Sequence, residues 1–421
     1  MQIVNEVCCG LDVHKRTVVA CLLRDEGCRG KPRKELRTFG TMTRDLEALA
    51  AWLKKEGCEH VAMESTGVYW KPLYNVLEGR CEEVLLVNAQ HIKNVPGRKT
   101  DMKDAEWIAT LLQHGLLSGS FVPPPEIREL RELTRYRKTL IQQRADQSNR
   151  IQKLLEGGNI KLASVASDVL GKSGTAMLVA LSRGETDPQL LAEKARGRLR
   201  AKIPQLIDAL SGVLNDTQRW LLGEQLEHVS ELDERIARLD ERIEALLRPF
   251  ESVVHRLGEI PGISRRVAEV IVAEIGLDMS RFPTAGHLAS WAGMCPGSHE
   301  SAGKRKSGRT RQGNVYLKGI LVEAAWAAGR TKNTYLSTKY QRLARRRGAK
   351  RACVAVGHFI LKIAYELLSQ PQAEYQDLGP TWLERTRHHS QLPQQLVRRL
   401  EGLGYDVTLT KRPDSNSDEA A

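Results

Sequence analysis

Two aspartates three residues apart, Asp101 and Asp104, stand at the predicted start of a helix that runs to about residue 117. Residues with this spacing share one face of a helix, with Cβ atoms about 5–6 Å apart. Two carboxylates this close repel each other unless a cation lies between them, so the pair could hold a metal ion. In the competing interpretation, both acids stabilise the helix N-terminus by facing its dipole.

Two further acids end predicted strands earlier in the chain. Asp12 closes an apolar run at 7–13, and Glu64 closes another at 60–64. Functional groups of open α/β sheets gather at the carboxyl ends of strands, so these acids would face Asp101 and Asp104 if the two strands are neighbours. Mg²⁺, with Mn²⁺ as the alternative, prefers such oxygen ligands and can stabilise both oxygens of a phosphodiester reaction. Taken alone, each acid could equally be a solvated strand end.

The elements that would position these acids alternate in type. Apolar runs predict strands at 7–13, 17–23, 35–39, 60–64 and 84–88, and helical periodicity predicts helices at 43–53, 69–79 and about 98–117. The order β-β-β-α-β-α-β-α predicts a mixed sheet with helices on both faces. We therefore expect an α/β domain over residues 1–125.

The remainder of the chain predicts an all-α architecture. After three prolines at 123–125, long helices are expected at 126–156 and 216–255, and the second has the heptad spacing of a coiled coil. The heptad run is short, so pairing of the two helices within the chain competes with pairing between copies. The predicted division is a helical or coiled-coil region at 126–255, a helical domain at 256–370 and a polar, flexible tail at 371–421. The segment at 157–215, broken by glycines, predicts short helices and carries no functional signal.

The basic charge of the chain is concentrated in one segment. The whole chain has 64 Lys and Arg residues against 51 Asp and Glu, a net charge of +13. Residues 303–351 contain 15 of the basic residues and a single acid, Glu323, so this segment carries +14 and the rest −1. A local patch of this kind is typical of proteins that bind a phosphate backbone. The candidate nucleic-acid contacts are Lys304, Arg305, Lys306, Arg309, Arg311, Arg345, Arg346 and Arg347.

A turn around Gly262 joins two predicted helices and resembles a helix-hairpin-helix, whose exposed N–H groups bind phosphate. A plain helical turn is the alternative. The eight cysteines form no C-x-x-C pair, and Cys8, Cys9 and Cys21 lie in apolar runs, so we expect reduced structural thiols. There is no apolar run long enough for a membrane helix and no signal-peptide pattern, which predicts a cytoplasmic protein.

The acidic motifs together resemble a known family. The resemblance is carried by GLDVHK at 10–15, ESTG at 64–67 and KTDMKDA at 99–105. These look like the DEDD site of RuvC-like nucleases, which have the RNase H-like fold. More narrowly, they resemble the DEDD insertion-sequence transposases of the IS110 family and its IS1111 subgroup, which are bridge-RNA-guided serine recombinases. The resemblance implies that Asp12, Glu64, Asp101 and Asp104 are the metal-binding tetrad.

The C-terminal part resembles the transposase domain of the same family, through SAGK at 301–304 and RTRQGN at 309–314. From the residues alone, Ser301 would be a weak nucleophile, because no Ser-His-Asp set can be identified around it. The resemblance implies that Ser301 forms a phosphoserine link to DNA, and Ser298 is its local competitor.

The expected function is therefore that of a transposase of a mobile insertion sequence, which cuts and rejoins donor and target double-stranded DNA. By resemblance, it is guided by a noncoding bridge RNA. We also expect a homo-oligomer, a dimer or tetramer, with self-association through the heptad region as a hypothesis, and a location at the bacterial nucleoid. No phosphate-binding P-loop motif is present, in agreement with strand exchange that needs no ATP. The alternatives are a hydrolytic, Mg²⁺-dependent endonuclease of the junction-resolvase type without serine chemistry, and a non-enzymatic regulator that binds nucleic acid.

Overall fold

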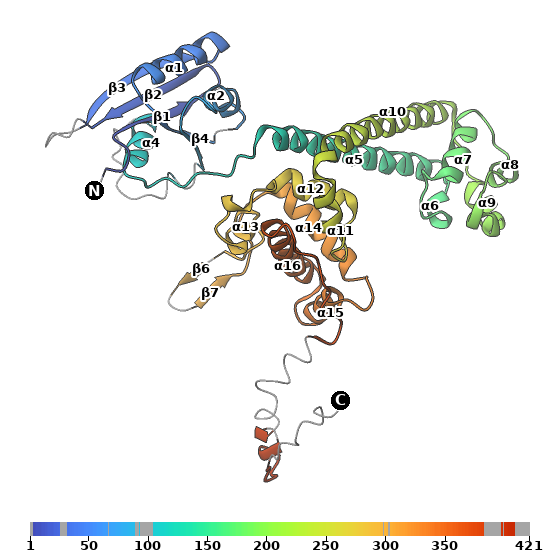
Figure 1. Cartoon of the computed structure of the whole chain (residues 1–421). Coiled ribbons are helices and arrows are strands. Elements are labelled where there is room, and N and C mark those ends of the chain that lie inside the picture. The colour runs from blue at the N-terminus through green and yellow to red at the C-terminus, as the bar shows by residue number, and fades with distance from the viewer. Residues whose placement is uncertain are drawn as a thin grey trace. The chain divides into compact units, whose positions relative to one another are not determined.

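The computed structural model describes residues 3–25, 32–65, 67–88, 92, 104–297, 299–301, 304–382, 397–398 and 400–408, with backbone alone at 299–301 and 304–307. The chain divides into two compact units, Met1–Val122 and Pro123–Ala421 (Figure 1). The further division of the second unit at residues 255 and 370 stays a prediction.

The first unit is built on a five-stranded mixed sheet. Its strands are β1 (Val7–Val13), β2 (Thr17–Arg24), β3 (Arg33–Gly40), β4 (His60–Glu64) and β5 (Glu83–Val87). They lie in the order β3-β2-β1-β4-β5, with β1 antiparallel to β2 and parallel to β4. The predicted mixed sheet is confirmed, and the strands that carry Asp12 and Glu64 are neighbours.

Helices cover both faces of this sheet, as the sequence predicts (Figure 1). Helices α1 (Thr43–Lys55) and α2 (Trp70–Leu77) share a buried cluster with Leu11 and Met63 on one face. On the other face, α4 (Asp104–Gln113) shares a cluster with Cys8 and Cys21. This helix ends at Gln113 rather than near residue 117, because Gly115 adopts a positive φ of 65° that stops it. Its predicted start near residue 98 lies outside the described residues.

Gly10 of β1 allows α4 to lie directly against the sheet. A Cβ at this position would come within 2.3 Å of the Ala105 carbonyl oxygen and the Ala109 nitrogen, both in the backbone of α4. Towards the other end of the helix, the Gln113 carbonyl accepts a hydrogen bond from the Val4 N–H at 2.9 Å. Helix α4 therefore runs antiparallel to β1, with its N-terminal end over the carboxyl end of that strand.

Substitution of Gly10 by Ala should destabilise the first unit by about 1–3 kcal/mol, because the new methyl group must push helix backbone aside. Urea denaturation of the full chain, followed by circular dichroism, measures this change. Gly258→Ala is the control, because a Cβ there meets no atom within 4 Å. Equal urea midpoints for the wild type and Gly10→Ala would contradict the close packing of α4 on β1.

Two long helices form the framework of the second unit. Helices α5 (Pro125–Gly157) and α10 (Asp216–Leu247) run antiparallel, joined by the ion pairs Arg137–Asp240 and Arg144–Asp233 (Figure 1). The helix predicted at 216–255 is interrupted after Leu247 because Pro249 lies in a 3-10 turn, η2 (Arg248–Phe250). Pairing within the chain, one of the two alternatives, is therefore present. A coiled coil between copies stays a prediction.

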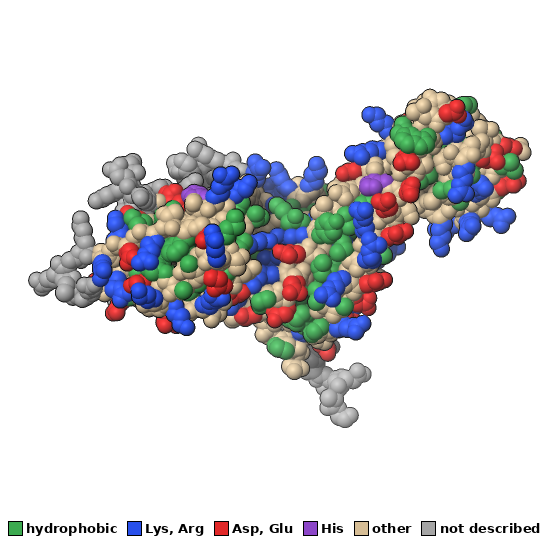
Figure 2. Space-filling view, turned by 90° about the horizontal axis from the view of Figure 1, so that it is seen from above, with side chains coloured by type: hydrophobic (Ala, Val, Ile, Leu, Met, Phe, Trp, Pro, Cys, Tyr) green, Lys and Arg blue, Asp and Glu red, His purple; other side chains and the backbone are tan. Residues whose placement is uncertain are grey.

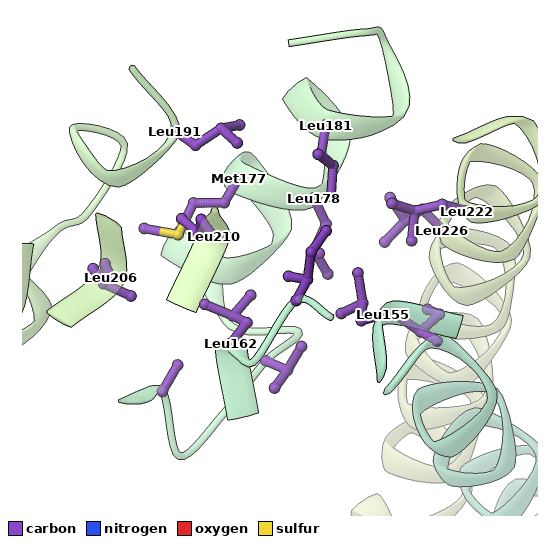
Figure 3. Close-up of a cluster of buried hydrophobic side chains, with 14 of the residues drawn as sticks. Leu155, Leu162, Met177, Leu178, Leu181, Leu191, Leu206, Leu210, Leu222 and Leu226 are labelled. Carbon is purple, nitrogen blue, oxygen red and sulfur yellow. The ribbon is translucent and has the colours of Figure 1, made fainter. Parts of the chain in front are cut away.

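A small helical cluster fills the connection between α5 and α10. Its elements are α6 (Leu162–Val165), α7 (Lys172–Ser182), α8 (Pro188–Ala192), η1 (Gly197–Lys202) and α9 (Ile203–Leu210). Leu162, Leu178 and Leu206 from these helices form one buried cluster with Leu155 of α5 and Leu222 of α10 (Figure 3). The predicted short helices at 157–215 are confirmed, and their apolar side chains fix the ends of the two long helices.

The C-terminal part is helical apart from one hairpin. It contains α11 (Glu251–Gly258), α12 (Arg265–Ile275), η3 (Met279–Arg281), α13 (Ala285–Trp291), β6 (His299–Ser301), β7 (Lys304–Ser307), α14 (Val315–Ala328), α15 (Tyr335–Arg347) and α16 (Ala349–Ser369). The two short strands lie where the sequence predicts only a polar loop.

Helix α16 is the centre of this part, with α11, α13, α14 and α15 packed against it. Contrary to the sequence expectation, its length and composition would allow it to span a membrane, the one such helix among the described residues. Half of its apolar stretch is buried inside the protein, and Val356, Ile360 and Leu361 are fully buried. Its apolar character is therefore explained by its place in the core.

Candidate active site

Asp12 and Glu64 lie side by side on the face of the sheet that α4 covers. Leu11 is opposite Met63 in the parallel β1–β4 pairing, so the next positions along the two strands are Asp12 and Glu64. Side chains alternate between the faces of a strand. Leu11 and Met63 belong to the cluster under α1 and α2, so the two acids belong to the opposite face.

Asp104 opens helix α4, whose N-terminal end lies over the carboxyl end of β1. Three of the four predicted acids thus come from separate elements to one edge of the sheet, which we call the carboxylate edge (Asp12, Glu64 and Asp104). Asp101, the fourth, lies outside the described residues. In the part of the chain that the structure describes, no three His, Cys, Asp or Glu side chains form a group that could hold a metal ion.

Asp12 has a close neighbour that the sequence analysis did not single out. The Nε2 atom of His14 lies 3.1 Å from Oδ2 of Asp12, and the Asp12 side chain is only 19% exposed. His14 can donate a hydrogen bond to this carboxylate, and its own side chain is exposed. The adjacent HK pair in GLDVHK was the available sequence signal.

Two cysteines, Cys8 and Cys21, are buried between the sheet and α4. Burial raises the pKa of Cys8 to about 12 and that of Cys21 to about 12, so both stay protonated at neutral pH. Neither cysteine forms a disulfide. The expected structural thiols are therefore present in the core of the first unit.

Ser301 lies on a separate hairpin in the second unit. Strands β6 and β7 pair antiparallel, with Ser301 opposite Lys304. At the base of the hairpin, the Gly297 N–H donates to the Arg309 carbonyl at 2.9 Å. The backbone position of Ser301 is described, but its side chain is not, and its competitor Ser298 lies outside the described residues.

The base of this hairpin depends on two glycines. A Cβ on Gly313 would be 2.3 Å from the Gly293 nitrogen, and a Cβ on Gly293 would be 2.9 Å from the Arg311 carbonyl oxygen. No side chain fits between the two segments. The glycine of the RTRQGN motif, Gly313, is therefore required because two backbone segments approach each other closely.

The predicted basic residues fall in two groups. Lys304, Arg305 and Lys306 form most of β7, and Arg309 and Arg311 are exposed directly after it. Arg345, Arg346 and Arg347 form the exposed last turn of α15. Among the described residues, none of these last three forms an ion pair, so their charge is available to a partner.

The arginines of α5 contrast with those of α15. Arg131, Arg135, Arg137 and Arg144 all form ion pairs within the second unit. On the face drawn in Figure 2, Lys and Arg side chains are mixed with Asp and Glu. The structure therefore explains these four arginines of α5 by intramolecular pairing.

Neutralising Arg345, Arg346 and Arg347 to Gln should weaken binding to duplex DNA and reduce the slope of log K against log salt by about 3. Each lost phosphate contact removes about 0.9 from this slope. Fluorescence anisotropy with a labelled duplex at several salt concentrations measures both quantities. The matched control replaces Arg235, Arg238 and Arg242 of α10 by Gln, because the sequence around these three arginines is rich in Asp and Glu. Equal slopes for the two triple variants would contradict the assignment.

Gly262 lies in the turn between α11 and α12, with a φ of 89°. A Cβ there would come within 2.3 Å of the Ala324 carbonyl oxygen in α14. The glycine is thus required for packing of the turn against α14. Its predicted contact with nucleic acid stays a prediction.

Comparison with known proteins gives two matches to family models. Residues 9–160 match the IS110-type DEDD model, described as Transposase, and this range includes Asp12, Glu64, Asp101 and Asp104. Residues 254–341, which include Ser301, match a model described as Transposase IS116/IS110/IS902 family.

Similar proteins are found in three bacteria. The chain is 27% identical over 325 residues to the transposase for insertion sequence element IS1111A of Coxiella burnetii, covering 76% of this chain and 79% of that protein. It is 31% identical over 258 residues to the insertion element IS110 uncharacterized 43.6 kDa protein of Streptomyces coelicolor, covering 55% and 61%. It is 30% identical over 131 residues to the putative transposase y4pF/y4sB of Sinorhizobium fredii, covering 30% and 33%.

Proposed function

We propose that this chain, which belongs to the IS110 family of DEDD transposases, cuts and rejoins DNA during movement of an insertion sequence. The observation that carries the proposal is the carboxylate edge: Asp12, Glu64 and Asp104 share one edge of the sheet, within the range matched by the DEDD model. The +14 charge of residues 303–351 supports a polyanionic partner.

The carboxylate edge, completed by Asp101, is proposed to hold Mg²⁺ or Mn²⁺. Carboxylate oxygens are the ligands that these ions prefer, and Asp12 and Glu64 come from adjacent parallel strands. When bound, the metal supplies charge stabilisation for the attacking and leaving oxygens of a phosphodiester. The role of the four acids would be to hold the ion at the carboxyl ends of β1 and β4.

Ser301 is the proposed nucleophile. Its hydroxyl oxygen forms a bond to the scissile phosphorus and gives up its proton to solvent, while the bond from phosphorus to the 3′-oxygen breaks. The 3′-oxygen takes up a proton and leaves as a 3′-OH, and the 5′-phosphate remains on the serine. Attack by the 3′-OH of the other strand reverses the link. The number of phosphodiester bonds is conserved, so no ATP is needed.

The proposed partners are double-stranded donor and target DNA, a bridge RNA and further copies of this chain in a dimer or tetramer. The basic hairpin, the last turn of α15 and the turn at Gly262 are the proposed nucleic-acid contacts. The proposed location is the bacterial cytoplasm, where the DNA lies. Chromatography of the purified chain with light scattering tests the oligomer.

A hydrolytic DEDD nuclease is the second candidate. The carboxylate edge favours it, because those acids can act with water and without Ser301. The deciding experiment incubates the full chain with DNA spanning the element's end, RNA from the flanking sequence and Mg²⁺. After denaturation, protein-linked DNA is digested and mapped by mass spectrometry. Phosphate on Ser301 supports the proposed function, free 5′-phosphate ends support hydrolysis, and binding without cutting supports a regulator.

A further inference from the structure

Glu274 is a fully buried acid in α12, within a run of apolar residues. Arg135 of α5 donates to it through two parallel hydrogen bonds, Nε to Oε1 and Nη2 to Oε2, each 2.7 Å long. Arg131, one turn earlier on α5, donates to the carbonyl oxygens of Ala273 at 3.1 Å and Glu274 at 2.5 Å. Glu274 therefore fixes α12 to α5 through both its backbone and its side chain.

Asn314 is the third partner of this acid. Its Nδ2 donates to Oε2 of Glu274 at 2.5 Å. Its Oδ1 accepts from the backbone N–H groups of Tyr316 at 3.1 Å and Leu317 at 3.0 Å, and so caps α14. The Arg135 guanidinium also lies 4.5 Å from the centre of the Tyr316 ring. One amide thus joins the start of α14 to the buried acid.

Asn314 also stands at the foot of the hairpin that carries Ser301. Gly313 precedes it and lies against Gly293 on the other side of the hairpin base. The Arg311 N–H donates to the Cys295 carbonyl at 3.4 Å. An unbroken path of contacts therefore runs from α5 through Glu274 and Asn314 to the base of the hairpin.

Stability alone does not account for this set of polar residues. Burial of a carboxylate carries a desolvation cost, and well-packed apolar residues often stabilise a core equally well. Burial also lowers the pKa of Arg131 to about 10, a value at which the side chain remains charged at neutral pH. Unlike apolar packing, this network specifies an orientation, because bidentate hydrogen bonds and a helix cap permit one orientation of α14 on α5.

We propose that Glu274 is a positioning residue for Ser301: through Asn314 it fixes the start of α14 and thereby the base of the serine hairpin. This inference rests on the proposed serine chemistry. A nucleophile displaced by about 1 Å reacts about 100-fold more slowly. DNA affinity is preserved, because the cations of β7 and α15 do not take part in the network.

The test uses Asn314→Asp in the full chain. Aspartate keeps the oxygen that caps α14, but it cannot donate to Glu274 and places a second carboxylate against it. The rate of covalent adduct formation at saturating DNA should fall about 100-fold, while the Kd for DNA stays within about twofold of wild type.

Asp233→Asn is the matched control, because it breaks the exposed Arg144 pair that also joins α5 to another helix. It should form adduct at the wild-type rate. Asn314→Ser, which keeps a capping oxygen and adds no charge, serves if Asn314→Asp does not fold. A wild-type rate in the folded Asn314 variant would overturn the positioning role. Absence of any adduct with wild-type protein would instead overturn the proposed function.

Discussion

Ser301→Ala should abolish the denaturation-resistant protein–DNA adduct and reduce strand exchange by more than about 10⁴-fold. Alanine has no oxygen to attack phosphorus, while the acids of the carboxylate edge and the basic residues of the chain are unchanged. The assay is electrophoresis of labelled DNA under denaturing conditions, with strand exchange scored by product length. Ser298→Ala, which removes the competing hydroxyl three residues earlier in the sequence, should behave as wild type.

Two outcomes would reject this role for Ser301. Mg²⁺-dependent cutting that continues unchanged in Ser301→Ala would assign the chemistry to water at the carboxylate edge, as in a hydrolytic nuclease. Loss of the adduct in Ser298→Ala alone would assign the nucleophile to the neighbouring serine. Binding of labelled DNA, measured in parallel, separates either outcome from loss of the complex.

Asp12→Asn and Glu64→Gln should each slow DNA cutting by about 10³-fold, and excess Mg²⁺ should restore only part of the rate. Each change keeps the size of the side chain and removes one charge from the carboxylate edge. Cutting rates over a Mg²⁺ titration measure the effect. Glu59→Gln is the control, because Glu59 is exposed and precedes β4 at the opposite end of the strand. Normal cutting by Asp12→Asn would reject the metal assignment.

Much of the first unit could be predicted from the sequence because its information is local. Apolar runs and helical periodicity gave the strands, the helices and their order, and the strand ends drew attention to Asp12 and Glu64. Whether the strands that carry these two acids are neighbours could not be predicted, because strand order depends on pairing between distant segments. The contact of Gly10 with α4 joins residues about a hundred positions apart, and no local pattern indicates it.

The second unit shows the same limit. Helix α5 was predicted almost to its ends, but the partners of its arginines were not, because charge alone does not distinguish an internal ion pair from a phosphate contact. Glu274 within the apolar run VIVAEIG was an available signal, since an isolated acid in such a run needs a buried partner. Its partners Arg135 and Asn314 come from α5 and from the start of α14, so only the folded chain identifies them.

The strand order β3-β2-β1-β4-β5, together with the order of the elements along the chain, limits when each part of the first unit can form during synthesis. Strands β1, β2 and β3 pair over short connections and can form first, whereas β4 must return to β1 in parallel, which is slower. Helix α4 reaches Gly10 only after all five strands have left the ribosome. Asp12, Glu64 and Asp104 therefore come together in that order, and Asp104 comes last. An incomplete chain that ends before α4 contains the sequence of all five strands but lacks Asp104, so it cannot assemble the carboxylate edge.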